Sequence, residues 1–372
     1  MSDPEGDTRT SGGTRSAPRR AVAGEVRDAV SFRTFLLIVG VLLLQMGFIL
    51  SYVGAFHDPS PHRLSVRVAG PEAAADRMVD RINALPDEPL RARTAPDPRA
   101  AREALTSGET AGVYVLRPSE PADRLLLATA GGSAKAEAVR SVLGGMAARQ
   151  GRQLEVSDVV PVQSGDSRGL TGFYLVVGWT VGGYLVAALL GVSRGALPAN
   201  PSRAAIRLVS VAVYAVLSGL GGALVVGPLL GALTGHPVRL WLLGALLVFA
   251  AAAVTMALQV LFGVVGIGLT VLLFVVLGNP SAGGAYAPEL LPAFWREIST
   301  ALPNGAGTDA VRNIVYFGSH HVTGDVLVIA AYALGGTVVA LLGAVLRARR
   351  APVPAPARED DGTAHGKHHR QE

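Results

Sequence analysis

Cysteine is absent from the chain, and lysine is nearly absent. Without cysteine the protein forms no disulfide, no thiolate metal site and no cysteine nucleophile, so a domain outside the cell must be stabilised by packing alone. Arginine carries nearly all of the positive charge, because Lys135 and Lys367 are the only lysines. This bias is typical of a high-GC bacterial genome, and it does not indicate a nucleic-acid partner.

The phosphate-binding loop of ATPases is also missing. The only Gly-Lys pair, Gly366-Lys367, is followed by His368 instead of Ser or Thr, so the backbone cradle and the lysine that hold phosphates are lacking. We therefore expect this chain to be no enzyme, with no catalytic residue and no bound cofactor. We expect no metal site either, because the histidines of the C-terminal tail lie in a stretch without fixed geometry.

Long apolar runs dominate what is present. Half of the 372 residues are hydrophobic and 16% are charged, and several runs exceed the length needed to cross a bilayer. A soluble core is excluded. The sequence predicts an α-helical polytopic membrane protein with six transmembrane helices and an extracytoplasmic α/β domain between the first and second spans.

The predicted spans follow from the positions of the runs and of the arginines. The run 240–278 has 39 residues without a charge, about 58 Å as a helix against a hydrocarbon core of roughly 30 Å, so it must hold two spans joined by a turn near 259–266. Arginine-rich flanks place both termini in the cytosol. The predicted spans are 34–56, 170–192, 208–234, two within 240–278, and 326–346.

Both ends of the chain are predicted to be disordered cytosolic tails, 1–33 and 347–372. The stretch 21–34 indicates either a short interfacial helix or a simple charged flank. No Asp, Glu, Lys or Arg lies inside the six spans as drawn. This absence weighs against an ion-driven antiporter, since such carriers need intramembrane ionisable groups.

The polar stretch 57–169 is predicted to form the extracytoplasmic α/β domain. Its pattern favours the order βααββα, with a final strand near Val159. The predicted strands are 64–68, 113–116 and 125–128, and the predicted helices are 71–85, 98–105 and 133–150. Ser133 is expected to cap the last of these helices.

An amphipathic hairpin is predicted at 279–325, between the fifth and sixth spans. A first short helix places Leu290, Leu291, Phe294 and Ile298 on a lipid-compatible face, and Trp295 suits the headgroup layer. A second helix is expected to start at a cap formed by the threonine at 308. Neither helix is long enough to span a bilayer. A plain connecting loop with incidental helices remains an alternative.

Two parts of the sequence resemble one family. The hairpin strings are NPSAGG at 279–284, PELLPAFW at 288–295, LPNG at 302–305 and DAVRN at 309–313. They look like the segment before the last span of type-2 ABC exporter permeases, in the branch that includes phage-infection-protein-like membrane proteins. The stretches AREAL at 101–105 and AGVYV at 111–115 resemble the extracytoplasmic domain of the same branch.

The resemblance implies a permease subunit in the bacterial plasma membrane. Two copies, as a homodimer or heterodimer, would enclose a path for a hydrophobic or amphipathic substrate, and a cytosolic ABC ATPase would act in trans. The hairpin would form re-entrant helices near the exit, in contact with membrane lipid. Candidate residues of this exit path are Glu289, Phe294, Trp295, Arg312 and Asn313, and candidate ATPase contacts are Arg27, Arg194, Arg203 and Arg207.

Several alternatives stay open. Glu289 and Arg312 are expected either to pair, to touch a substrate headgroup, or simply to lie at an interface. The loop between the second and third spans is either an ATPase contact or a basic tether. The whole chain is alternatively a non-transporting surface protein, a phage-receptor-like or secretion-accessory subunit that acts through its external domain.

Overall fold

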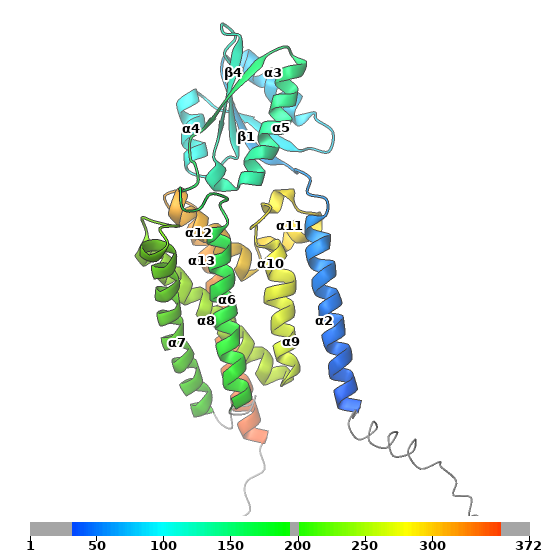
Figure 1. Ribbon diagram of the computed structural model, residues 1–372, viewed down its shortest axis with the longest axis vertical. Coiled ribbons are helices and arrows are strands. Elements are labelled where there is room, and N and C mark those ends of the chain that lie inside the picture. Colours follow the sequence, from blue (N-terminus) through cyan, green and yellow to red (C-terminus); the bar gives the residue numbers. More distant parts are fainter. Residues whose placement is uncertain (1–31, 194–200, 351–372) are drawn as a thin grey trace, which may run out of the picture. The chain divides into compact units, whose positions relative to one another are not determined.

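The computed structural model describes residues 32–193 and 201–350. Within these ranges five helices are long and apolar enough to cross a membrane, which agrees with a multi-pass membrane protein (Figure 1). They are α2 (Phe32–Phe56), α6 (Thr171–Ser193), α7 (Pro201–Leu224), α8 (Pro237–Phe262) and α13 (Val322–Arg350). A π-helical turn, η2 (Val225–Leu229), follows α7. Residues 1–31 and 351–372 of the two predicted tails and the centre of the loop before α7 lie outside the described residues. The predicted bounds of the tails are wrong at their inner ends, since residues 32–33 belong to α2 and residues 347–350 belong to α13.

The charge-free run breaks where the sequence predicts a turn. Helix α8 ends at Phe262, and Gly263 takes a φ of 61°, which favours glycine. The chain then continues through α9 (Val265–Val271), the π-helical η3 (Leu272–Leu277) and α10 (Gly278–Ser281). This apolar helical stretch, Val265–Ser281, is shorter than the five long helices. Its 17 residues give ~26 Å at 1.5 Å per residue, so a sixth span stays a prediction.

The chain divides into two compact units. The first contains residues 32–174 and 271–325, and the second contains residues 175–270 and 326–350 as far as they are described. The α/β domain and the predicted hairpin therefore belong to one unit.

The α/β domain is a five-stranded sheet with helices on both faces (Figure 1). The strand order is β2-β1-β3-β4-β5; the β3–β4 pair is antiparallel and the other pairs are parallel. The elements in chain order are β1 (Leu64–Ala69), α3 (Glu72–Asn83), β2 (Leu90–Thr94), α4 (Pro98–Thr106), β3 (Gly112–Val115), β4 (Ala122–Leu127), η1 (Thr129–Gly131), α5 (Ser133–Arg149) and β5 (Gln153–Asp158).

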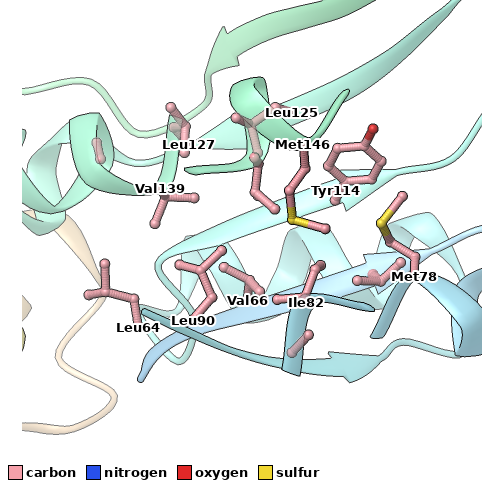
Figure 2. Packing of buried hydrophobic residues seen from close by; sticks show 14 of the residues in the cluster. Leu64, Val66, Met78, Ile82, Leu90, Tyr114, Leu125, Leu127, Val139 and Met146 are labelled. Atoms are coloured by element: carbon pink, nitrogen blue, oxygen red, sulfur yellow. The ribbon is translucent and has the colours of Figure 1, made fainter. Parts of the chain in front are cut away.

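Each face of the sheet has its own apolar core. Helices α3 and α5 cover one face, where Val66, Ile82 and Val139 are fully buried among the side chains of Figure 2. Helix α4 covers the other face through Ala101 and Leu105. The apolar residues that alternate along β1, Leu64, Val66 and Val68, belong to the first core, because every second side chain of a strand points to the same face. Ala69 at the end of β1 belongs to the second core.

Strand β2 is absent from the order predicted from sequence, which runs directly from one helix to the next. The strand is five residues long and carries two arginines, so its alternation is too short to stand out. The side chain of Asn83 fixes it by accepting from Ala92 N at 2.8 Å and donating to Ala92 O at 3.1 Å. The three predicted helices and the other predicted strands are present with small shifts of their ends. Ser133 does not cap α5, since Gly132 holds the cap position.

The hairpin contains η4 (Pro288–Leu290), α11 (Ala293–Ser299) and α12 (Pro303–Tyr316). The prediction that the second helix starts at Thr308 is wrong. Helix α12 begins at Pro303, because proline is suited to the first helical position, where its missing N–H is not needed. Thr308 lies inside the helix, where its hydroxyl donates to Asn304 O at 2.9 Å.

The second unit depends on close approach of helices at small residues. A Cβ at Gly219 of α7 would lie 2.4 Å from Ala245 N of α8, so the two helix backbones nearly touch there. A Cβ at Gly222 would lie 2.3 Å from the Trp179 ring. Gly221 has open space around it, so the close approach involves two of these three glycines.

Candidate functional site

The hairpin closes one end of the α/β domain. Leu290 belongs to the core beneath α3 and α5, and Phe317, directly after α12, belongs to the core beneath α4. Two backbone hydrogen bonds join the segment just before β1 to η4. They run from Ser60 N to Leu290 O at 3.1 Å and from His62 N to Glu289 O at 2.9 Å. The hairpin is therefore continuous with the folded domain and is not a separate surface loop.

The polar residues of this contact form a cluster of four charges. Lys135 Nζ, in the first turn of α5, lies 2.8 Å from Glu289 Oε1. Arg312 Nη1 lies 3.2 Å from Asp309 Oδ1, one turn away on α12, and Arg312 Nη2 donates to Gly283 O at 3.1 Å. The Lys135–Glu289 pair thus ties α5 to η4, and Arg312 ties α12 to the chain at Gly283, both by charge-assisted bonds.

A cavity of about 190 Å³ lies over this cluster, and we name it the junction cavity. One wall comes from the ends of the strands and the adjoining turns, and the other comes from η4 and α12. It is lined by Ser65, Gly108, Glu109, Thr110, Ala111, Ala128, Gly131, Lys135, Glu289, Asp309, Arg312, Asn313 and Phe317.

Two of the three carboxylates that line the cavity, Glu289 and Asp309, have opposite pKa shifts. Burial opposes the charge of Glu289, but the Lys135 ammonium outweighs it and holds the pKa of Glu289 below its ordinary value. Burial raises the pKa of Asp309, and the positive charges of Arg312 and Lys135 offset this rise only in part. The Oε2 atom of Glu289 is buried and has no hydrogen-bond partner.

A second polar contact fixes the chain just before α6. Asp166 Oδ1 accepts from Thr171 N at 2.9 Å and from Thr171 Oγ1 at 2.7 Å, and its Oδ2 accepts from the Tyr316 hydroxyl at 3.2 Å. Burial, with the nearby Asp166 charge, raises the pKa of Tyr316 to about 12. Tyr316 therefore stays a neutral donor that holds α12 to this linker.

The structure brings three of the predicted exit-path residues together. Glu289, Arg312 and Asn313 line the junction cavity. The alternative in which Glu289 and Arg312 form an ion pair with each other is wrong. Glu289 pairs with Lys135, and Arg312 pairs with Asp309. Sequence reasoning does not identify Lys135 or Asp166 as members of the site, because both are far from the hairpin in the chain and no local pattern marks them.

Phe294 and Trp295 lie away from the cavity. Phe294 is 57% exposed, whereas Trp295 is 9% exposed and packs with Ala55 of α2 and Leu291. Leu290 and Leu291 are buried in protein, so the expected lipid-compatible face is wrong for these two residues. The Trp295 ring is also buried in protein, whereas the sequence predicts that it lies in the headgroup layer.

The predicted ATPase contacts are described in part. Arg203 is exposed and Arg207 is half-buried in the first turns of α7, while Arg27 and Arg194 lie outside the described residues. Across the described ranges, no group of three His, Asp or Glu side chains is placed to hold a metal ion.

Comparisons with protein-family models, with curated proteins and with solved structures give no match.

Proposed function

We propose that the protein is the membrane-spanning permease subunit of an ABC-type exporter in the bacterial plasma membrane. The observation that carries the proposal is the hairpin of α11 and α12. It stands between the charge-free run and the last long helix, at the place and with the strings that resemble type-2 exporter permeases.

In this proposal the chain crosses the membrane six times. The stretch Val265–Ser281 is the additional span next to the five long helices, and local thinning of the bilayer accommodates its shorter length. An even number of spans keeps both arginine-flanked ends in the cytosol and places the α/β domain outside.

Transport in this proposal uses ATP that a separate subunit hydrolyses, because the sequence has no phosphate-binding loop. Arg203 and Arg207 at the start of α7 face that subunit. Two permease chains, identical or different, enclose the path, and ATP binding and release bias two arrangements of their spans. The uncharged spans favour a hydrophobic or amphipathic cargo.

The test is affinity purification of the tagged chain from its native membrane in mild detergent. We expect a nucleotide-binding protein in stoichiometric amount, with an ATPase rate that changes when this chain is removed. The double variant Arg203→Ala, Arg207→Ala should lower recovery of the partner at least threefold. Arg239→Ala, in the first turn of α8 on the proposed outer side, is the matched control. A preparation without such a partner overturns the proposal.

A second candidate is a surface protein that acts through its external domain. The junction cavity favours it, because a polar cavity walled by that domain serves a binding protein without any transport. The same purification separates the two candidates. The surface-protein candidate is supported if no ATPase partner is recovered and substitutions in the junction cavity abolish the function at the cell surface.

A further inference from the structure

We infer that the α/β domain binds a phosphate monoester with an apolar organic group, in a hollow between helices α3 and α5. This helix hollow is lined by Arg81, Leu85, Met146, Arg149 and Gln150. Its volume is about 450 Å³, and sites for small organic ligands have volumes of about 300 to 1,000 Å³. The helix hollow and the junction cavity share no lining residue, so they are separate sites.

The helix hollow lies at the end of α5 opposite to the junction cavity. Lys135, in the first turn of α5, reaches the hairpin through its pair with Glu289. Arg149 is the last residue of the same helix, ~21 Å further along the axis at 1.5 Å per residue. Substitutions at one site therefore leave the residues of the other in place.

Two arginines give the helix hollow its charge. No carboxylate lines it, and within residues 32–193 and 201–350 the guanidinium groups of Arg81 and Arg149 have no ion pair and no hydrogen bond. Both residues are exposed, so their N–H groups are open to a ligand. Two positive charges at one hollow repel each other, and an anion between them replaces this repulsion with attraction.

The helix dipole explains the charge of these arginines but not the position of the Arg149 guanidinium. Arg81 and Arg149 each lie in the last turn of a helix, where a cation is favourable at the negative end of the dipole. Arg149 Nη1, however, lies 3.7 Å from the position that a Cβ of Gly145 would take, one turn back along α5. The guanidinium therefore lies over the side of the helix, and the missing Cβ leaves room for it there.

A phosphate monoester matches the charge and the donors of the helix hollow. Its charge at pH 7 is about −1.5 to −2, against the two positive charges of Arg81 and Arg149. Each guanidinium presents a planar fork of N–H donors that binds phosphate oxygens in pairs. Three terminal oxygens can accept from both forks at once, whereas a carboxylate has only two oxygens.

The apolar group of the ligand belongs to Leu85 and Met146. Met146 is 5% exposed, and Leu85 packs on the same apolar core beneath α3 and α5. These two side chains are more buried than the arginines and form the floor of the helix hollow. A methionine sulfur contacts aromatic rings favourably, and guanidinium groups stack on them. An aromatic phosphate therefore gains at both ends, while inorganic phosphate gains only from the arginines.

Phenyl phosphate is the probe for this site. It is titrated calorimetrically into full-length protein in an uncharged detergent, with inorganic phosphate and phenol, each alone, as half-ligand controls. We expect phenyl phosphate to bind at least tenfold more tightly than either control. Phosphatidic acid is the lipid form of the same chemistry. Competition by nanodiscs that contain it, and not by phosphatidylcholine nanodiscs, assigns a lipid headgroup as the ligand, and absence of competition assigns a soluble monoester.

The variants separate the helix hollow from charge in general. Arg81→Ala and Arg149→Ala should each weaken binding at least tenfold. Arg149→Lys keeps the charge at the helix end but loses the fork, so it should weaken binding at least threefold with the melting temperature unchanged. Leu85→Ser should lower the affinity for phenyl phosphate toward that for inorganic phosphate. Arg102→Ala removes an exposed arginine of α4, on the other face of the sheet, and should leave binding unchanged.

The inference is overturned if phenyl phosphate does not bind, or if it binds no more tightly than inorganic phosphate. It is also overturned if Arg102→Ala weakens binding as much as Arg149→Ala does, because the anion is then attracted by the charge of the whole domain. The arginine variants change exposed side chains and decide the matter even if Leu85→Ser does not fold. The inference does not depend on export, so it stands or falls separately from the ATPase partner.

Discussion

The side-chain amide of Asn304, on α12, donates to the Asn279 side-chain oxygen of α10 at 2.8 Å. The same amide donates to Phe274 O at 3.1 Å, in the π-helical turn η3. Ser51 of α2 donates to Val276 O in the same turn. Side chains from two other elements therefore bind carbonyls of a helical turn whose backbone bonding is irregular, and they hold the hairpin to that turn.

Asn304→Leu should destabilise this arrangement. The substitution removes both hydrogen bonds of a fully buried side chain and leaves the acceptor at Phe274 without that donor. We expect a loss of about 2 kcal/mol in unfolding free energy. Thermal unfolding in detergent, followed by the fluorescence of tryptophans such as the nearby Trp295, measures it.

Ser299→Ala is the matched control for this prediction. Ser299 is 1% exposed, and its hydroxyl has no hydrogen-bond partner. Its removal should be neutral or slightly stabilising, since an unsatisfied buried hydroxyl is lost. If Asn304→Leu and Ser299→Ala have the same melting temperature, the Asn304 amide does not hold the hairpin.

The α/β domain should be sensitive to the charge of Asp123. Its side chain is 1% exposed, and it accepts from Arg152 Nε and Nη2 at 2.8 Å, from the Tyr114 hydroxyl at 2.9 Å and from Arg117 N at 2.9 Å. Asp123→Ala leaves the Arg152 charge without its buried partner. The expected cost is about 3 kcal/mol.

The pH dependence of Asp123 has a definite sign. Burial opposes its charge, but the bonds from Arg152, Arg117 N and Tyr114 hold its pKa below the ordinary value. Its contribution is therefore present above the unfolded pKa of about 3.9 and is lost as pH falls through the lower folded pKa. Melting curves from pH 6 to pH 3 should show this loss in the wild type and not in Asp123→Ala. Arg140→Ala, at an exposed pair, should keep the wild-type profile.

Glu289 and Asp309, two of the carboxylates of the junction cavity, should respond to pH in opposite directions. The raised pKa of Asp309 means that its ionised form is unfavourable in the folded state, so stability falls as pH rises through its folded pKa. Asp309→Asn should therefore melt higher than the wild type at pH 7, and the difference should shrink toward pH 4. The lowered pKa of Glu289 means that its ionised form is favourable in the folded state, so stability falls as pH falls through its folded pKa. Glu289→Gln should melt lower at pH 7 and converge on the wild type in acid, and shifts of the same sign would contradict this assignment.

Much of the fold could be predicted because it follows from local pattern. Charge-free runs mark the long helices, and alternation marks β1 and the antiparallel pair of β3 and β4. Strand β2 was missed because five residues with two exposed arginines carry little signal. The start of α12 was missed because Pro303, Asn304 and Gly305 resemble a break, although Pro303 suits a helix start and the side-chain nitrogen of Asn304 finds its acceptors in tertiary contacts.

The candidate site could be predicted only on its hairpin side. Glu289, Arg312 and Asn313 stand out as polar residues within an apolar segment. Lys135 lies 154 residues before Glu289, and its ion pair arises from the packing of the domain on the hairpin. No periodicity within α5 encodes that contact.

Gly219 and Gly221 of α7 offer a paired test of the helix packing in the second unit. A Cβ at position 219 would lie 2.4 Å from Ala245 N and 2.7 Å from Trp241 O, both backbone atoms of α8 that cannot move alone. Gly219→Ala must therefore separate the two helices, and we expect a loss of about 2 kcal/mol. A Cβ at position 221 meets no atom within 4 Å, so Gly221→Ala should be neutral or should stabilise α7 by about 0.5 to 1 kcal/mol through helix propensity.

Thermal unfolding of the purified variants in one detergent gives both values. Equal melting temperatures would mean that α7 and α8 do not touch at Gly219, whereas a lower value for Gly219→Ala alone establishes backbone contact as the basis of this packing.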